Sequence, residues 1–358
     1  MLADAPIIAR LSAFGLAVAG LMAVTNVVME VARKKATTGR VLVPAAFWCH
    51  IFDTLVFVLA WGYYRLRGYG FYVRGGGDLF GISGLHISPM AIFVVYELID
   101  FLIHGLATWL FFKALQEAAM STAVPFLSFT SVLIIPTGFV LLGELPDIAK
   151  LLGVLLTTVG SVMMHWRLFA VGWKEPVKAI YRDKGSRYML YTAVLLAVLS
   201  PLDKKLSLMT DIYTQCVIFG VGMSVFFFFM ARARREPLLP VLSGGIRWIA
   251  LAGILDAATI LLQFESYQYL DSVIVISIKR SGIVLAVVFG WLFFRERNIR
   301  DKLMASTMMF IGVSMLYFPL TTLQATATAA VTLILMALYM ALVPPGPTVD
   351  LAEDAPQH

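Results

Sequence analysis

Charged residues are scarce in this chain, since Asp, Glu, Lys and Arg make up 14% of its 358 residues. A soluble domain carries about 25%, whereas 60% of this sequence is hydrophobic and its mean hydropathy is +0.85. This shortage of charge excludes a soluble globular protein and predicts that most of the chain lies in lipid. The net charge of +6 does not indicate nucleic-acid binding, because Lys and Arg are scattered over short loops, as membrane topology requires.

Cysteine is nearly absent. Cys49 and Cys216 both fall within apolar runs, so they offer no disulfide framework and no metal-ligand spacing. We expect two small buried side chains. The chain also lacks a Walker Gly-Lys-Ser/Thr loop, which excludes ATP as the motor of any transport. We therefore predict no cofactor and no bound metal.

Ten apolar runs of about 20 residues, bounded by charge, Gly or Pro, predict ten membrane-spanning helices in two sets of five. They are predicted at Leu11–Ala32, Val41–Tyr64, Met90–Leu115, Ala118–Leu142, Ile148–Phe169, Tyr188–Met209, Ile212–Ala231, Ile246–Tyr269, Ser272–Phe294 and Lys302–Phe318. A polar connector at 170–187 separates the two sets. An uncharged run at 323–343 predicts one additional C-terminal helix, and the acidic, Pro-rich tail at 344–358 predicts disorder.

The two sets carry an internal repeat. The same residue types recur 152 positions apart in the pairs Phe112 and Phe264, Gly138 and Gly290, Glu144 and Glu296, Gly160 and Gly312, and Met163 and Met315. The repeated units are predicted at 11–169 and 188–318. Because each unit has an odd number of spans, the second unit begins on the side of the membrane opposite to the side on which the first begins. The sequence therefore predicts an all-α membrane protein of two inverted five-helix repeats around a central cavity, which is a geometry suited to alternating access.

Particular segments carry a family resemblance. The first half contains FFKALQEAAMSTAVPFLSFTSVL, LLGE and LLGVLLTTVGSVMM, and the second contains SIKRSGIVLAVVFGWLFFRE and FIGVSMLY. These segments resemble the drug/metabolite transporter superfamily, specifically its ten-helix EamA-type carriers, over almost all of residues 11–318. The resemblance implies a secondary carrier of small metabolites, coupled to protons or to exchange, in the plasma (inner) membrane if the source is bacterial.

Membrane orientation has two opposed indicators. The resemblance implies a cytoplasmic N-terminus. The loops after the first, third, fifth, seventh and ninth spans hold 19 Lys and Arg, against 7 on the opposite side. Positive-inside counting therefore places the N-terminus outside, and the orientation is open.

Ionisable side chains within spans cost roughly 2.5 to 3.5 kcal/mol each on insertion scales, so each one indicates a partner or a role. Glu97, Asp100 and His104 share one face of the third span. Asp256 lies in the eighth span, 152 positions after His104. In a two-fold cavity such positions face each other or the same lumen, so we predict that His104 and Asp256 bind substrate or a proton. The alternative is a structural hydrogen bond between the third and eighth helices.

Two further pairs are candidates for substrate binding or coupling. His50 and Asp53 are three residues apart in the second span, and an ordinary polar pair is the alternative for them. Lys279 and Arg280 are consecutive in the ninth span. A cation there would neutralise either Asp256 or an anionic substrate. The family resemblance further favours a functional role for this pair.

Prolines and helix-terminal polar groups suggest gating and structural roles. Pro125 and Pro136 predict a bent or locally unwound fourth span, and Pro201 predicts a break in the sixth. Asn26, in a Thr25-Asn26 pair aligned with Ser200-Pro201, is the candidate kink of the first span. Glu144 and Glu296 end their helices. We expect each to cap its helix or to hold neighbouring helices together, instead of taking part in transport. We interpret Asp203 and Lys204 as a local ion pair near the water boundary, and Glu30 as a partner of Arg33 or Lys34.

Two competing functions remain open at this point. An intramembrane lipid-modifying enzyme would need a catalytic dyad, for which His50 with Asp53 or His104 with Asp100 are the candidates, but no HExxH or similar frame surrounds them. We predict no enzymatic activity and no catalytic residue. A non-transporting receptor or scaffold would tolerate neutralisation of Asp256, whereas a carrier would not. The expected partners are therefore a small-molecule substrate and the lipid bilayer, with no nucleic acid.

Overall fold

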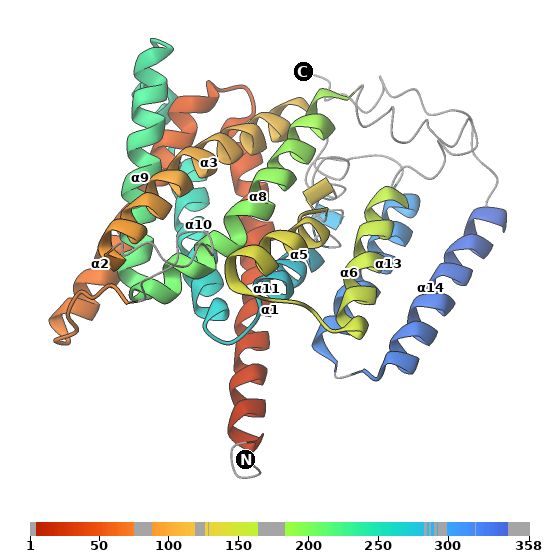
Figure 1. The fold of residues 1–358 in the computed structure, drawn as a ribbon. Coiled ribbons are helices and arrows are strands. Elements are labelled where there is room, and N and C mark those ends of the chain that lie inside the picture. Colours follow the sequence, from red (N-terminus) through yellow and green to blue (C-terminus); the bar gives the residue numbers. More distant parts are fainter. Residues whose placement is uncertain are drawn as a thin grey trace.

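The computed structural model describes residues 5–74, 88–118, 126–127, 129–163, 183–282, 285, 288–289, 292, 299–318 and 320–342. Within these residues the protein is all-helical and has no strand (Figure 1). Its α-helices are α1 (Ala5–Thr37), α2 (Leu42–Leu66), α3 (Pro89–Glu117), α5 (Phe129–Leu142), α6 (Ile148–Met163), α8 (Lys184–Met209), α9 (Ile212–Ala233), α10 (Ile246–Tyr267), α11 (Ser272–Ser281), α13 (Ile299–Tyr317) and α14 (Thr322–Leu342), with a short 3-10 helix η3 (Pro240–Leu242) before α10.

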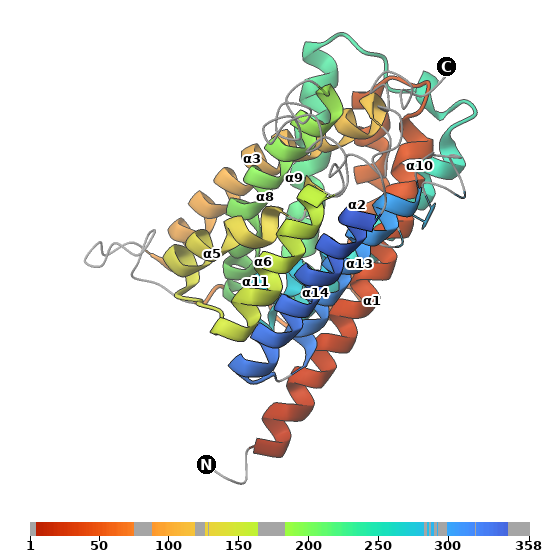
Figure 2. The same ribbon diagram turned by 90° about the vertical axis from the view of Figure 1, so that its right-hand side faces the viewer.

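Six of the described helices are long and apolar enough to cross a membrane: α1, α2, α3, α9, α10 and α14. Three shorter apolar stretches lie in α5, α6 and α13. These helices overlap the predicted spans. The additional C-terminal helix is present as α14, which packs beside α6 and α13 (Figure 2). The C-terminal tail predicted to be disordered lies outside the described residues.

Two predicted spans differ from the helices that the structure describes within them. The fourth span was placed at Ala118–Leu142, but Ala118 ends α3 in extended backbone and α5 begins at Phe129. Pro125 lies outside the described residues, and α5 continues through Pro136. The ninth span was placed from Ser272 to Phe294, but α11 ends at Ser281. Lys279 and Arg280 therefore lie in the last turn of a short helix.

The helix α8 differs from its prediction at both Lys184 and Pro201. It begins at Lys184, because Asp183 caps it by accepting a hydrogen bond from the Ser186 backbone N–H, so the polar connector ends earlier than predicted. The predicted break at Pro201 is wrong, since α8 continues to Met209. Proline removes the hydrogen bond to the carbonyl four residues earlier. That carbonyl, on Ala197, instead accepts a hydrogen bond from the Thr137 hydroxyl of α5 at 2.5 Å.

The helices pack mainly as four pairs, namely α1 with α10, α3 with α8, α2 with α9 and α6 with α13. Figure 1 shows α6 and α13 side by side, with α14 beyond them at one edge of the bundle and α2, α3 and α9 toward the opposite edge. The largest cluster of buried apolar side chains joins residues of α1, α2, α9, α10 and α11. The first and second halves of the chain are therefore interleaved.

Glycines bring α6 and α13 into close contact. Gly312 lies against Gly153 and Thr157, while Gly160 lies against Ala305. Residues later in α6 therefore contact residues earlier in α13, so the two helices are antiparallel. Small residues allow such backbone approach between membrane helices.

We expect Gly312→Ala to destabilise the protein by about 1–3 kcal/mol through overpacking. An added Cβ would lie 2.6 Å from the Gly153 carbonyl oxygen and 2.7 Å from the Thr157 nitrogen, and neither backbone atom can move away cheaply. Gly62→Ala is the matched control, because nothing lies within 4 Å of a Cβ there, and alanine is favoured over glycine inside a helix by about 1 kcal/mol. Thermal unfolding in detergent measures both. Equal melting temperatures for wild type and Gly312→Ala would contradict the close contact.

Candidate functional site

A cavity lies at the centre of the bundle, and its space together with the solvent space at its mouth is about 780 Å³. Its walls come from both halves of the chain. The lining residues are Asn26, Met29, Glu30 and Arg33 of α1, His50 of α2, His104, Ala107, Thr108 and Phe111 of α3, Leu127 before α5, Thr192, Leu196, Ser200 and Asp203 of α8, Phe219 of α9, Asp256, Ile260, Gln263 and Phe264 of α10, and Ile276, Lys279 and Arg280 of α11. A polar cavity inside an apolar bundle is a candidate ligand site.

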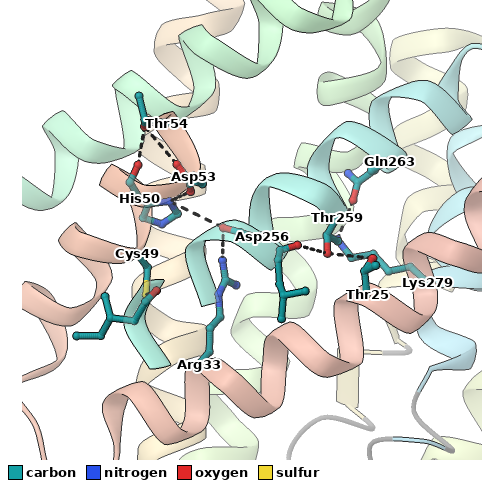
Figure 3. Close-up of polar contacts among 12 residues, drawn as sticks. Thr25, Arg33, Cys49, His50, Asp53, Thr54, Asp256, Thr259, Gln263 and Lys279 are labelled. Carbon is teal, nitrogen blue, oxygen red and sulfur yellow. Dashed lines mark hydrogen bonds and ion pairs between the residues drawn. The ribbon is translucent and has the colours of Figure 1, made fainter. Parts of the chain in front are cut away.

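The ion pair between Arg33 and Asp256 joins α1 to α10 across this cavity. Arg33 Nη2 donates to Asp256 Oδ2 at 2.5 Å, and both side chains are buried (Figure 3). The guanidinium also lies over the Phe112 ring, 5.0 Å from its centroid. A charge-assisted hydrogen bond of this kind is strong where water is excluded. Asp256 is therefore neutralised by a residue of the other half of the chain.

His50 and Asp53 form a second polar contact beside that ion pair. His50 Nδ1 and Asp53 Oδ2 are 2.7 Å apart, and His50 Nδ1 is 4.0 Å from Asp256 Oδ2. The His50 ring stacks on Phe227 of α9, and the Thr54 hydroxyl donates to Asp53 Oδ1. His50 lines the cavity, whereas Asp53 lies behind it and orients the imidazole.

His104 belongs to a separate cluster on α3 and α8. Its Nδ1 is 3.6 Å from Asp100 Oδ2 and 3.9 Å from Asp203 Oδ1. The imidazole packs edge-on against Phe219 of α9. His104 and Asp203 line the cavity, while Asp100 and Glu97 are buried behind them. His104 and Asp256 thus share one lumen, as predicted, but each has its own partner.

The two cations of α11 face the cavity without a carboxylate in hydrogen-bond contact in the described part of the chain. Lys279 Nζ donates to Gln263 Oε1 at 2.7 Å. Arg280 is buried, and its Nε has no hydrogen-bond partner among the described residues. Both lie at the C-terminal end of a helix, where the helix dipole favours positive charge. On α1, Glu30 accepts a hydrogen bond from Asn26 at 2.7 Å.

Glu144 joins three helices at the end of the bundle. It accepts hydrogen bonds from Lys204 Nζ at 2.5 Å, from the Ser272 hydroxyl at 2.6 Å and from the Ser272 backbone N–H at 2.9 Å. Partial burial, with repulsion from Glu144, raises the pKa of Asp271 at the start of α11. Lys204 also donates to the Leu270 carbonyl. The clasp predicted for Glu144 is present in the structure, whereas Glu296 lies outside the described residues.

The predicted local ion pair of Asp203 with Lys204 is wrong. These side chains leave α8 in different directions, Asp203 toward His104 and Lys204 toward Glu144. The reason is helical geometry, since consecutive residues point about 100° apart. Asn26 lies inside the continuous helix α1, bonded to Glu30, and its predicted gating role stays a prediction.

Sequence reasoning overlooked Arg33, Glu30 and Asp203 as cavity residues. Arg33 begins the run Arg33-Lys34-Lys35, which looks like an interfacial cluster, yet Arg33 is only 8% exposed. A signal was present: Asn26, Glu30 and Arg33 are spaced by four and then three residues, which places them on one helical face.

The long apolar helices and the buried polar cavity define an integral, multi-pass membrane protein. Residues 183–318, which extend from the cap of α8 through α13, match the model of the EamA-like transporter family. The resemblance to drug/metabolite transporters is thus confirmed for the second half of the chain. Members of this family transport small molecules across membranes and are not enzymes.

Comparison with solved structures supports the fold over most of the chain. One structure, described only as "Crystal structure of protein", aligns with a TM-score of 0.57 at 16% identity and covers 83% of this chain and 94% of its own. At that identity the likeness concerns the fold alone. No curated protein matches the sequence.

Proposed function

We propose that this protein is a secondary carrier that moves a small organic molecule bearing an anionic group through the central cavity by alternating access. The observation that carries the proposal is the two-fold relation of the cavity walls. His104, Thr108 and Phe111 of α3 line the cavity at positions that, 152 residues later, are Asp256, Ile260 and Gln263 of α10.

The walls contributed by α1 and α8 are also equivalent, with an offset of 170 residues instead of 152. The lining residues Asn26, Glu30 and Arg33 have the same spacing as Leu196, Ser200 and Asp203. This relation equates Asn26 with Leu196, instead of with the Ser200-Pro201 pair chosen from the sequence. A cavity lined at equivalent positions by two units fits a carrier that opens to either side with similar energy.

Close contacts elsewhere agree with this two-fold relation. Gly15 of α1 lies against Leu270, and Gly185 of α8 lies against Ala118, which is 152 residues before Leu270. Lys34 donates to the Ala118 carbonyl, as Lys204 does to the Leu270 carbonyl.

The packing of α6 against α13 supports inverted units. Two equivalent helices that exchange the same contacts lie across a two-fold axis. Because α6 and α13 are antiparallel, that axis is perpendicular to both helices. For helices that cross a bilayer, it therefore lies in the membrane plane, which is the geometry of inverted repeats.

The charge of the substrate follows from the partners in the cavity. A cation at Lys279 or Arg280 was expected to neutralise either Asp256 or a substrate, and Arg33 already pairs with Asp256. Lys279 donates its hydrogen bond to the neutral side chain of Gln263. A carboxylate or phosphate group on the substrate would complete this pair of cations.

Coupling to protons, or exchange of one substrate for another, completes the proposal. His50 and His104 line the cavity, and imidazole is the side chain whose ordinary pKa lies nearest neutral pH. Uptake into proteoliposomes driven by an imposed pH gradient would support proton coupling, whereas uptake dependent on internal substrate would support exchange.

The test is a ligand panel followed by a flux assay. The purified protein is melted with organic anions, amino acids, nucleosides, sugars and lipophilic cations. A ligand at 100 times its dissociation constant should stabilise the folded state by about 2.7 kcal/mol. We expect organic anions to stabilise wild type but not Lys279→Ala, and the same compounds to be transported in proteoliposomes.

Lys150→Ala is the matched control, because Lys150 lies on α6 in an exposed ion pair with Asp147, outside the cavity. It should respond to anions as wild type does. Stabilisation by cations alone would overturn the anionic substrate, and absence of flux for every stabilising compound would overturn the carrier.

A further inference from the structure

Three acidic side chains and one histidine meet between α3 and α8 without a basic partner in hydrogen-bond contact among the described residues. Asp100 and Asp203 are 1% and 3% exposed, and Glu97 is 5% exposed. Both oxygens of Asp100, both oxygens of Glu97, one oxygen of Asp203 and Nδ1 of His104 are buried with no hydrogen-bond partner in the part of the chain that the structure describes. A buried carboxylate left charged and without a partner is strongly unfavourable, so this cluster needs either protons on its carboxylates or a bound metal cation.

The distances from His104 to the two aspartates are too long for hydrogen bonds and suit a shared ion. The Nδ1 of His104 is 3.6 Å from Asp100 Oδ2 and 3.9 Å from Asp203 Oδ1, beyond the roughly 2.7–3.2 Å of a nitrogen–oxygen hydrogen bond. Ligand atoms about 2.0–2.2 Å from one metal ion lie roughly 3–4 Å from one another. One ligand atom from each of Asp100, His104 and Asp203 lies within 4.8 Å of the other two.

The neighbouring cluster shows why this one lacks an internal cation. His50, Asp53 and Asp256 also bring three such side chains together, but Arg33 supplies the positive charge there. The two-fold relation of the walls places Asp203 of α8 where α1 has Arg33. Lys279 interacts electrostatically with Asp203. Its ammonium group, however, donates a hydrogen bond to Gln263. An ion from solution can take the place that a guanidinium has in the first cluster.

We propose that Asp100, His104 and Asp203 form a binding site for one divalent transition-metal cation on the cavity wall. Two carboxylates and an imidazole form a mixed oxygen and nitrogen ligand set, which suits Zn²⁺ or Mn²⁺ better than Mg²⁺. Glu97, three residues before Asp100, adds negative charge behind the site. His104 and Asp203 border the cavity, so the ion has a route of entry and open coordination positions toward the lumen.

This site could not be found from sequence spacing, because its ligands come from two helices that are distant along the chain. It also replaces the sequence prediction that no metal binds. The binding itself does not rest on the proposed transport function, since it requires only the cluster and its access to the cavity.

The test uses Co²⁺ as a visible-absorbing probe on the full-length protein, prepared without a polyhistidine tag and stripped by a chelator. We expect one equivalent to bind with a d–d absorption band, and Zn²⁺ to displace it. Loss of an outer-shell partner alone weakens metal binding by about 10–100-fold, so Asp100→Asn, His104→Gln and Asp203→Asn should each weaken it by more than about 100-fold.

Asp53→Asn is the matched control, because it makes the same change in the cluster that already contains Arg33. Its Co²⁺ affinity should equal that of wild type. A wild-type protein that binds no Co²⁺ or Zn²⁺ between pH 6 and 8.5 would overturn the proposal and leave protons as the cations of this cluster. Equal loss in Asp53→Asn, or no loss in any of the three ligand variants, would also overturn it.

X-ray absorption of the Zn²⁺-loaded wild type keeps the test independent of variants that fail to fold. One imidazole nitrogen together with oxygen ligands is expected. A spectrum without an imidazole contribution would contradict the site.

Discussion

Asp256→Asn is expected to lower transport by at least about 100-fold while leaving the folded yield intact. The substitution removes the carboxylate that neutralises Arg33 across the α1–α10 contact. Leaving one partner of a buried pair uncompensated costs about 3–5 kcal/mol, and every 1.4 kcal/mol is about tenfold in an equilibrium. A carrier alternates between two conformations of similar free energy. A change of this size in one cavity wall shifts that equilibrium toward one conformation and so slows the transport cycle.

The protein should nevertheless fold, because asparagine keeps an oxygen for Arg33 and because Arg33 borders the cavity, where water can hydrate it. The measurement is substrate flux in proteoliposomes at matched protein content. Asp211→Asn is the control: Asp211 also pairs with an arginine, Arg65 at 3.2 Å, but it caps α9 away from the cavity. Its flux should be close to wild type.

The double variant Arg33→Gln with Asp256→Asn separates a structural role from a transport role. Removing both charges should recover stability, since no buried charge is left unpaired, yet flux should stay low. Flux that survives in Asp256→Asn would contradict a transport role for Asp256.

The helices could be predicted from the sequence because an apolar run is a local feature. The same holds for His50, His104, Asp256, Lys279 and Arg280, which are conspicuous as ionisable residues inside such runs and which all line the cavity. The contacts of Asp256 with Arg33 and of His104 with Asp203 could not be predicted, because each joins helices distant in the chain. The contact of His50 with Asp53 lies within one helix, and its spacing was visible in the sequence. Arg33 and Asp203 were missed for a different reason, since a charge near the end of an apolar run looks interfacial.

Two local rules failed where tertiary contacts decide the outcome. Proline usually ends a helix, but Thr137 from α5 bonds the carbonyl that Pro201 leaves free, and α8 continues. The apolar run after Ser272 extends well past Gly282, so nothing in its composition predicted that α11 ends at Ser281. That early end places Lys279 and Arg280 at a helix C-terminus, where two adjacent cations are better tolerated.

Glu144→Ala is expected to be the most destabilising single change outside the cavity, by about 3–5 kcal/mol. The carboxylate holds Lys204 of α8 and the start of α11 at once, and both side chains of the ion pair are largely buried, at 12% and 10% exposure. Without it, Lys204 loses its counter-charge and Ser272 loses the acceptor for its backbone N–H. At about 2–4 °C per kcal/mol, the melting temperature in detergent should fall by roughly 10 °C.

Asp147→Ala is the matched control from the same loop. Asp147 is 60% exposed and pairs with Lys150 at 3.4 Å, and it also accepts a hydrogen bond from the Lys150 backbone N–H at the start of α6. Its loss should cost only about 1 kcal/mol, the usual worth of a helix cap. The pair itself is isolated by Lys204→Met combined with Glu144→Ala, which should destabilise by less than the sum of the single changes, because the two groups interact directly. Additive effects, or a Glu144→Ala melting temperature no lower than that of Asp147→Ala, would show that Glu144 does not hold α8 and α11 together.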